Sequence, residues 1–70
     1  MTVAEKIRLL LGRRSMTITS LAANIGISRQ YLTKCLNENS FNIKDLKAIA
    51  VALNCSFEAG FVMNDTREKF

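Results

Sequence analysis

The sequence has no histidine and no proline, and its 70 residues include only two cysteines and three glycines. Without histidine or a Cys-x-x-Cys pair, the common ligands of a zinc site are missing, and we expect neither a metal nor another cofactor. Acid–base and nucleophilic catalysis normally need a histidine or paired carboxylates in a cleft, whereas the six acidic residues here are scattered. These absences predict a protein that is not an enzyme.

Long apolar runs and low-complexity linkers are also missing. No segment approaches the roughly 20 consecutive apolar residues that cross a bilayer, and charges interrupt residues 1–11, where a signal peptide would be apolar. Cys35 and Cys55 lie among apolar residues, as reduced buried thiols do. We expect one small cytoplasmic unit without membrane contact and without a second domain for a small-molecule ligand.

Positive charge is concentrated in the first half of the chain, although the net charge is only +4. Residues 1–37 contain six basic residues and one acidic residue, which gives +5. Residues 38–70 contain four basic and five acidic residues, which gives −1. This asymmetry favours a polyanionic partner on one face of the protein.

A signal for the start of a helix recurs three times. An apolar residue precedes a polar one, and a leucine follows four positions later; the polar residues are Thr17, Ser28 and Asn42. Such a side chain caps free backbone N–H groups, while the apolar pair fixes the angle of the chain. With a capping box formed by Thr2 and Glu5, these signals predict four helices.

Apolar residues between these starts recur at helical spacing, so each predicted helix has one face for the core. The predicted core residues are Val3, Ile7, Leu10, Leu11, Leu21, Ala22, Ile25, Leu32, Cys35, Leu36, Leu46, Ile49, Ala50 and Leu53. Gly26 and Asn54 follow the second and fourth helices, where a left-handed residue commonly ends a helix. The expected fold is mainly α, a compact four-helix bundle over residues 1–54 that precedes a β-strand or hairpin over residues 55–70.

The tail over residues 55–70 changes to an alternating pattern, which indicates a strand. The alternating apolar residues are Phe57, Ala59, Phe61 and Met63. Residues 64–65 suit a turn, after which residues 66–70 can return as a second strand. A fifth short helix starting at Ser56 is the alternative, but Gly60 and the phenylalanine and valine content favour the strand.

The segment over residues 17–36 carries the functional signal. Its helices are predicted over residues 18–24 and 29–36, with a joint at residues 25–27. Ala22 lets the two helices cross closely, Gly26 permits the sharp joint, and Leu32 reaches the core. This spacing of alanine, glycine and leucine is that of a helix-turn-helix.

On these residues, the stretch over residues 1–53 resembles the Cro/cI-type family of DNA-binding proteins, often called the XRE family. The resemblance implies a lambda-repressor-like bundle whose recognition helix, about residues 28–37, lies in the major groove of double-stranded DNA. One position departs from the family pattern: many members have glutamine where this chain has Ile18. There, Thr17 or backbone N–H groups would contact the DNA backbone instead.

That placement divides the exposed side chains into two groups. Candidates for reading base edges are Arg29, Gln30, Thr33 and Lys34. Arginine or lysine pairs with guanine O6 and N7, and glutamine with adenine N6 and N7. Candidates for phosphate contacts are Thr17, Ser28, Tyr31, Asn37, Arg13 and Arg14. Roles without DNA are also open: Ser28 caps a helix, Tyr31 can cover an apolar rim, and the charges can face solvent.

One helix-turn-helix covers only a short half-site, so we expect two copies on a pseudo-palindromic operator. A strand that carries Phe57, Phe61 and Met63 would leave apolar surface exposed, and we expect these residues to form the contact of a homodimer. The leading hypothesis is a sequence-specific DNA-binding transcriptional regulator, such as a repressor, that acts by occupying an operator; activation is also open. The alternative, which Ile18 keeps open, is a protein-interaction module such as an antitoxin or adaptor with the same fold.

Overall fold

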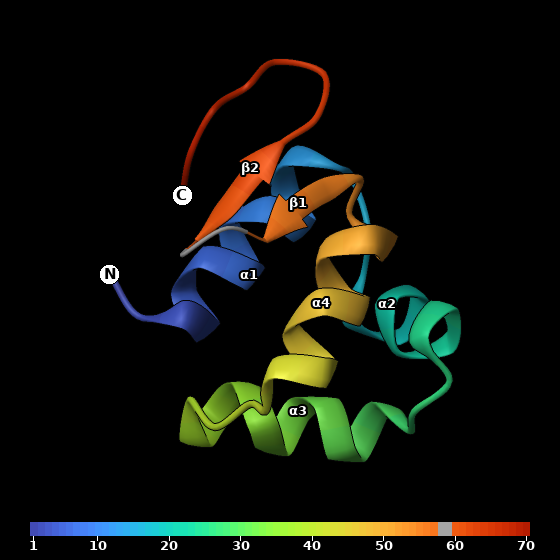
Figure 1. Ribbon diagram of the computed structural model, residues 1–70. Helices are drawn as coiled ribbons and strands as arrows, with labels where there is room; N and C mark the ends of the chain where they lie inside the picture. The colour runs from blue at the N-terminus through green and yellow to red at the C-terminus, as the bar shows by residue number, and fades with distance from the viewer. Residues whose placement is uncertain (58–59) are drawn as a thin grey trace.

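The computed structural model describes residues 1–57 and 60–70 and has the predicted class of fold, a helical bundle followed by a small antiparallel sheet (Figure 1). The elements in this part of the chain are α1 (Val3–Arg13), α2 (Ile18–Ile25), α3 (Arg29–Glu38), α4 (Ile43–Ala52), β1 (Cys55–Phe57) and β2 (Phe61–Met63). None of the helices in the described residues is long and apolar enough to span a membrane.

The predicted helix starts are confirmed, each by a side chain that accepts a backbone N–H. Thr17, Ser28 and Asn42 accept the N–H of the residue three positions later, at 3.0, 3.1 and 2.7 Å. Thr2 and Glu5 form the capping box predicted at the start of α1. Each of these bonds satisfies a donor that the first turn of a helix leaves without an intrahelical partner.

Residues with positive φ follow all four helices. Gly26 (φ 76°) ends α2 and Asn54 (φ 55°) follows α4, as predicted. Ser15 after α1 (φ 55°) and Asn39 after α3 (φ 49°) were not predicted to take this conformation. Asn39 is the residue that ends α3, so the helix runs to Glu38 and not to its predicted end at residue 36.

The core contains the residues predicted for it, all of which are buried or half-buried. The large side chains with less than 2% exposure are Phe61, Ile7, Leu10, Leu21, Leu32, Ile49 and Leu53. They come from every helix or its end and from β2, so the hairpin closes the same core that the helices form. Removal of this apolar surface from water is the main term that stabilises the fold.

The tail is a hairpin to which a third segment is added. β1 pairs antiparallel with β2, with Phe57 opposite Phe61. The chain turns at residues 64–66 and returns along β2, where Phe61 and Phe70 exchange backbone hydrogen bonds of 3.1 and 2.8 Å. Residues 66–70 therefore return along β2 as predicted, but with an isolated bridge between Val62 and Lys69 and not as a regular strand. The alternative helix starting at Ser56 is wrong because that residue lies in β1.

The single alternating strand predicted across residues 57–63 is also wrong. Gly60 separates two short strands and has a φ of 153°, a conformation that side chains disfavour. A Cβ atom at Gly60 would lie 2.8 Å from the Phe70 carbonyl oxygen, so the close pairing of the third segment requires glycine there. The alternation is not retained in β2, whose three side chains are all buried. Ala59 lies outside the described residues.

The apolar surface expected on the tail is not present for two of its three residues. Phe61 and Met63 are 1% and 4% exposed, because both side chains fill the core under the helices. Phe57 is half-buried, and its ring contacts Phe61 edge to face, with 5.3 Å between ring centroids. Phe61 and Met63 therefore do not offer the exposed apolar surface that was expected to form a dimer contact. The homodimer itself stays a prediction.

Candidate nucleic-acid interface

The joint between α2 and α3 has the geometry of the predicted helix-turn-helix. Gly26 adopts the left-handed conformation, and Ile27 N donates to Ala22 O at 3.1 Å across the joint. Ala22 and Leu32 are buried where α2 and α3 pack together. The result, seen in Figure 1, is that α3 lies along one end of the molecule while the hairpin lies at the opposite end.

The outer face of α3 brings the four predicted base-reading residues together. Arg29, Gln30 and Lys34 are exposed and Thr33 is half-exposed, because Leu32, Cys35 and Leu36 take the inward positions. The side chains that line an open hollow on this face are Arg29, Gln30, Thr33, Lys34, Asn37 and Glu38. The face therefore presents hydrogen-bond donors and two cations, with one carboxylate at its end.

Glu38 is a residue of this face that the sequence reading placed just beyond the helix. Since α3 ends at Glu38, this exposed carboxylate lies in the last turn beside Asn37. A negative charge there opposes contact with phosphate, although a carboxylate can accept from the N4 amine of cytosine. A left-handed Asn39, which lengthens α3, is the feature that sequence reasoning missed.

Thr17 and Ser28, two of the predicted phosphate contacts, lie at the starts of α2 and α3. Thr17 donates its hydroxyl to Ser20 Oγ at 3.0 Å, whereas the Ser28 oxygen accepts Tyr31 N. A serine hydroxyl has one donor as well as two acceptor sites, so Ser28 can cap α3 and donate outward at the same time. Ile18, at the position that departs from the family pattern, is half-buried and packs against the core.

Tyr31 links α3 to the start of α4. Its hydroxyl donates to Asp45 Oδ2 at 3.2 Å, and its ring is partly exposed. Hydrogen bonding with Cys35 raises the pKa of Tyr31, and the negative charge of Asp45 raises it further. A phosphate contact by this hydroxyl would therefore have to replace its bond to Asp45.

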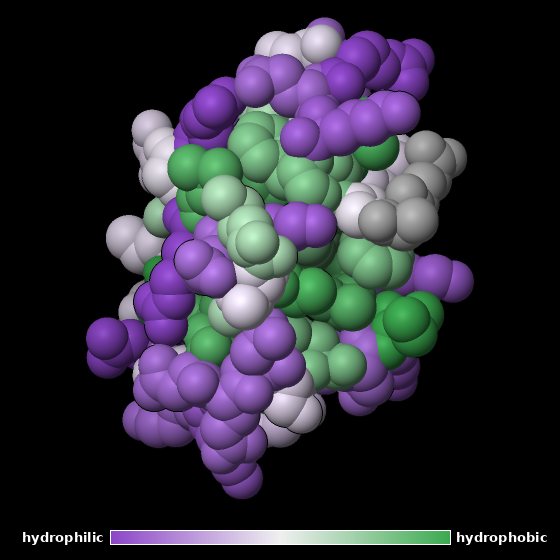
Figure 2. All heavy atoms as spheres, turned by 90° about the vertical axis from the view of Figure 1, so that its left-hand side faces the viewer, coloured by the Kyte–Doolittle hydropathy of each residue, from purple (hydrophilic) through white to green (hydrophobic). Residues whose placement is uncertain are grey.

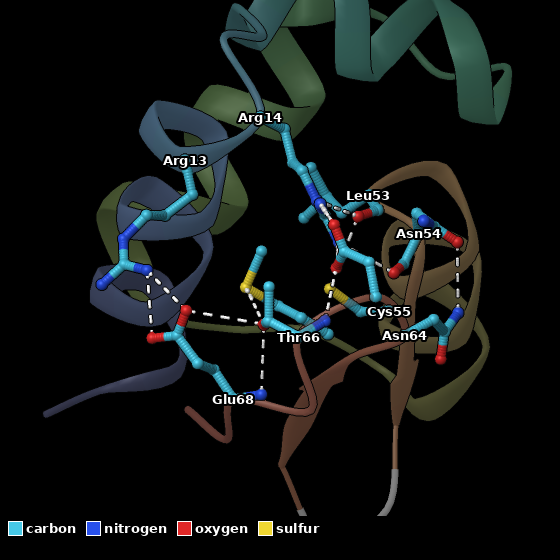
Figure 3. A network of polar contacts seen from close by, with 10 residues as sticks. Arg13, Arg14, Leu53, Asn54, Cys55, Asn64, Thr66 and Glu68 are labelled. Atoms are coloured by element: carbon cyan, nitrogen blue, oxygen red, sulfur yellow. Dashed lines mark hydrogen bonds and ion pairs between the residues drawn. The ribbon is translucent and has the colours of Figure 1, made fainter.

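Arg13 and Arg14 lie at the other end of the molecule, where both guanidinium groups are bonded to the tail (Figure 3). Arg13 pairs with Glu68 at 3.0 Å. Arg14 makes a bidentate pair with Asp65 at 2.9 and 3.1 Å, which holds the pKa of that carboxyl below its usual value. A phosphate would therefore have to compete with these carboxylates, and the phosphate contact of the two arginines stays a prediction.

Asn37 is bonded to α1 by a residue that the sequence reading did not select. Arg8 Nη2 donates to Asn37 Oδ1 at 3.2 Å, and both side chains are exposed. Two residues further on, Asn39 Oδ1 accepts the backbone N–H of Ala4 at 3.0 Å. The only signal for Arg8 in the sequence was its outward position next to the core residue Ile7.

Two polar groups lie at the two ends of the face seen in Figure 2, with apolar side chains between them. The view is turned about the vertical axis of Figure 1, so the lower group is at the end with α3 and the upper group is at the end with residues 64–69.

No cluster of three potential metal ligands occurs in the part of the chain that the structure describes. Cys35 and Cys55 are free and buried, and burial raises the pKa of Cys55.

Comparison with protein families places this geometry among known domains. A family model described as a Cro/C1-type HTH DNA-binding domain matches residues 6–58. The match includes most of α1, the complete α2, α3 and α4, and β1. Searches of curated proteins and of solved structures gave no match.

Proposed function

The chain belongs to the Cro/C1-type HTH DNA-binding domains, and from this premise we propose that it regulates transcription by occupying a specific operator, as a repressor does. The outer face of α3 carries the proposal. Arg29 and Lys34 are exposed there, and neither forms an ion pair with another described residue. We also propose that the protein is cytoplasmic, because a regulator of this kind must reach its operator there.

Base reading is assigned to the four outward residues of α3. Arg29 or Lys34 would donate to guanine O6 and N7, and Gln30 would form a bidentate pair with adenine. Thr33 lies between them and can contact either polar base edges or a thymine methyl group. Each well-formed pair would contribute about 1–3 kcal/mol of discrimination between bases.

Phosphate contacts are assigned to the starts of α2 and α3 and to the end of α3. Thr17, Ser28, Tyr31 and Asn37 are the side chains at these places. Backbone N–H groups at the two helix starts, where the helix dipole is positive, add donors that do not depend on Ile18. These contacts would set the orientation of α3 in the groove without reading sequence.

Two copies are proposed to bind a pseudo-palindromic operator. A twofold pair of helices reads two half-sites that lie one helical turn apart. Of the three tail residues first considered for the dimer contact, Phe57 is the one that is not fully buried. A dimer contact through the tail would therefore depend on Phe57 and on surface around it.

Selection of bound duplexes from a random pool tests the proposal most directly. We expect enrichment of one sequence with two related half-sites, about 10 base pairs from centre to centre. Enrichment of a single half-site would contradict the homodimer but leave DNA reading intact. Recovery of unselected sequence only would contradict operator recognition.

The second candidate is a protein-interaction module with the same fold. Ile43 and Val51 on α4 are 59% and 78% exposed and provide apolar surface for a partner. The salt dependence of DNA binding separates the two candidates, because counterion release makes affinity fall steeply with added salt. A flat response, or no binding at low salt, would favour the interaction module.

A further inference from the structure

The contact between Arg8 and Asn37 joins two exposed polar side chains that are 29 positions apart in the sequence. Arg8 Nη2 donates to Asn37 Oδ1 at 3.2 Å, from the outward side of α1 to the last turn of α3. Arginine has five N–H donors, and this bond uses one of them. The other donors and the positive charge of Arg8 lie beside the end of the proposed recognition helix.

The bond also determines what Asn37 can recognise. An asparagine reads adenine with its amide oxygen and nitrogen together. Arg8 already donates to one lone pair of the Asn37 oxygen, whereas both amide N–H groups of Asn37 remain free for another ligand. Free N–H donors next to a cation fit an anionic oxygen better than a bidentate contact with adenine, for which the Asn37 oxygen would have to accept from the base as well as from Arg8.

The two side chains are attached to a rigid junction. Asn39 Oδ1 accepts Ala4 N at 3.0 Å, so the start of α1 is fixed to the end of α3. Asn39 can reach Ala4 because it leaves α3 in the left-handed conformation, with a φ of 49°. Side chains held in this way lose less freedom when a ligand binds.

The charge of Arg8 is not neutralised by a carboxylate within the described residues, where the ion pairs are those of Arg13 and Arg14. This separates Arg8 from the two arginines at the end of the same helix. We propose that Arg8 and Asn37 together form a clamp for one DNA phosphate, in which Arg8 supplies charge and also orients the Asn37 amide. The clamp rests on the proposed DNA-binding function and adds a residue of α1 to its interface.

The test compares Arg8→Ala, Asn37→Ala and the double variant with wild type on a labelled mixed-sequence duplex of about 20 base pairs, two turns of DNA. Binding is measured over a salt series. We expect Arg8→Ala to reduce the slope of log K against log salt by about one, and to weaken binding to all sequences alike. The double variant should lose less than the sum of the single losses, because the two residues act together.

Lys6→Ala is the matched control, because it removes a charge from the same helix on nearly the opposite side, about 200° around from Arg8. Its salt slope should stay closer to that of wild type than the slope of Arg8→Ala. Arg8→Gln removes the charge but keeps a donor for Asn37 Oδ1, so it replaces Arg8→Ala if that variant does not fold. Thermal unfolding of each variant establishes which ones are folded.

The outcomes separate the clamp from the function on which it rests. If wild type does not bind duplex DNA at low salt, both proposals are overturned. If wild type binds but the slope for the folded Arg8 variant equals that for Lys6→Ala, only the clamp is overturned. A change in base preference caused by Arg8→Ala would also overturn it, because a phosphate contact is independent of sequence.

Discussion

The two ends of the molecule use the same kind of charged side chain in opposite ways. At the end with the hairpin, Arg13 and Arg14 are bonded to Glu68 and Asp65 of the tail (Figure 3). At the other end, Arg29 and Lys34 extend from α3 without an ion pair to any described residue. The first pair of cations holds the tail on the bundle, and the second pair is available to a ligand.

Net charge along the sequence does not distinguish these two uses. All four cations belong to the positively charged first half of the chain. The carboxylates that neutralise Arg13 and Arg14 are 55 and 51 positions away and reach them only because the tail folds back. A basic segment therefore indicates a binding surface only after its internal partners have been identified.

Arg14→Ala should have the largest effect on stability. The Arg14 side chain is 16% exposed and donates to Leu53 O at 2.8 Å and Asn54 O at 3.1 Å, besides its bidentate pair with Asp65. Its loss removes a charged donor from two carbonyl groups and a carboxylate, although Asn54 O keeps the Asn64 N–H, Leu53 O keeps the weak thiol donor of Cys55, and Asp65 keeps the Thr66 N–H. We expect the thermal unfolding midpoint to fall by several degrees, as measured by circular dichroism.

Arg13→Ala is the matched control for Arg14→Ala, because its pair with Glu68 is exposed on both sides and should change the midpoint little. The sequence-based prediction that Arg14 contacts phosphate gives the opposite result for Arg14→Ala. In that case the midpoint would hold, and the salt slope of DNA binding would fall by about one.

At the end with α3, single substitutions should affect recognition and leave stability unchanged. Arg29→Ala, Gln30→Ala and Lys34→Ala each remove an exposed side chain, and each should cost about 1–3 kcal/mol of discrimination at one base pair. Competition between the selected operator and single-base variants measures this cost. Lys47→Ala on α4 removes an exposed charge outside the proposed interface and should leave the order of preference intact. Equal weakening on every sequence would assign these residues to phosphates.

The bundle was predictable because its signals are local. Thr17, Ser28 and Asn42 mark helix starts through bonds to backbone only three residues away. The apolar spacing in each helix then determines its inward face, so the outward face of α3 follows from Leu32 and Leu36 alone. These features depend on no contact between distant segments.

The tail and much of the site were not predictable, because they depend on such distant contacts. Gly60 is required by the carbonyl of Phe70, a contact that exists only after the third segment has paired. In the same way, the bond from Arg8 to Asn37 depends on how α1 and α3 cross. Periodicity indicates which side of a helix faces out, but it does not indicate which other element lies beside it.

Acid should weaken the end with the hairpin. The Arg14 guanidinium lowers the pKa of Asp65 in the folded protein, so this pair stabilises the fold above the unfolded value of about 3.9. That contribution is lost as the pH falls through the lower folded pKa. Asp65→Asn should therefore reduce stability at neutral pH and make the decline at acid pH shallower.

Thermal unfolding of wild type and Asp65→Asn between about pH 5 and pH 2 measures this difference, since it spans the ordinary range for aspartate. Glu5 adds a second contribution of the same sign, because the Thr2 backbone N–H lowers its pKa. Glu5→Gln is therefore the companion variant. Parallel curves for wild type and Asp65→Asn would show that the pair with Arg14 does not stabilise the tail.

Glu38→Gln should have the smallest effect. It tests whether the end with α3, where the cations are not neutralised, is open to the anionic backbone of DNA. Glu38 is an exposed carboxylate beside Asn37, and a negative charge in the last turn of α3 also opposes the helix dipole. Its removal should raise affinity for all duplexes by a similar small factor, measured at a single salt concentration. A loss confined to sites with cytosine at one position would instead assign Glu38 to the N4 amine of that base. That result would extend the base-reading face by one turn, from Lys34 to the end of the helix.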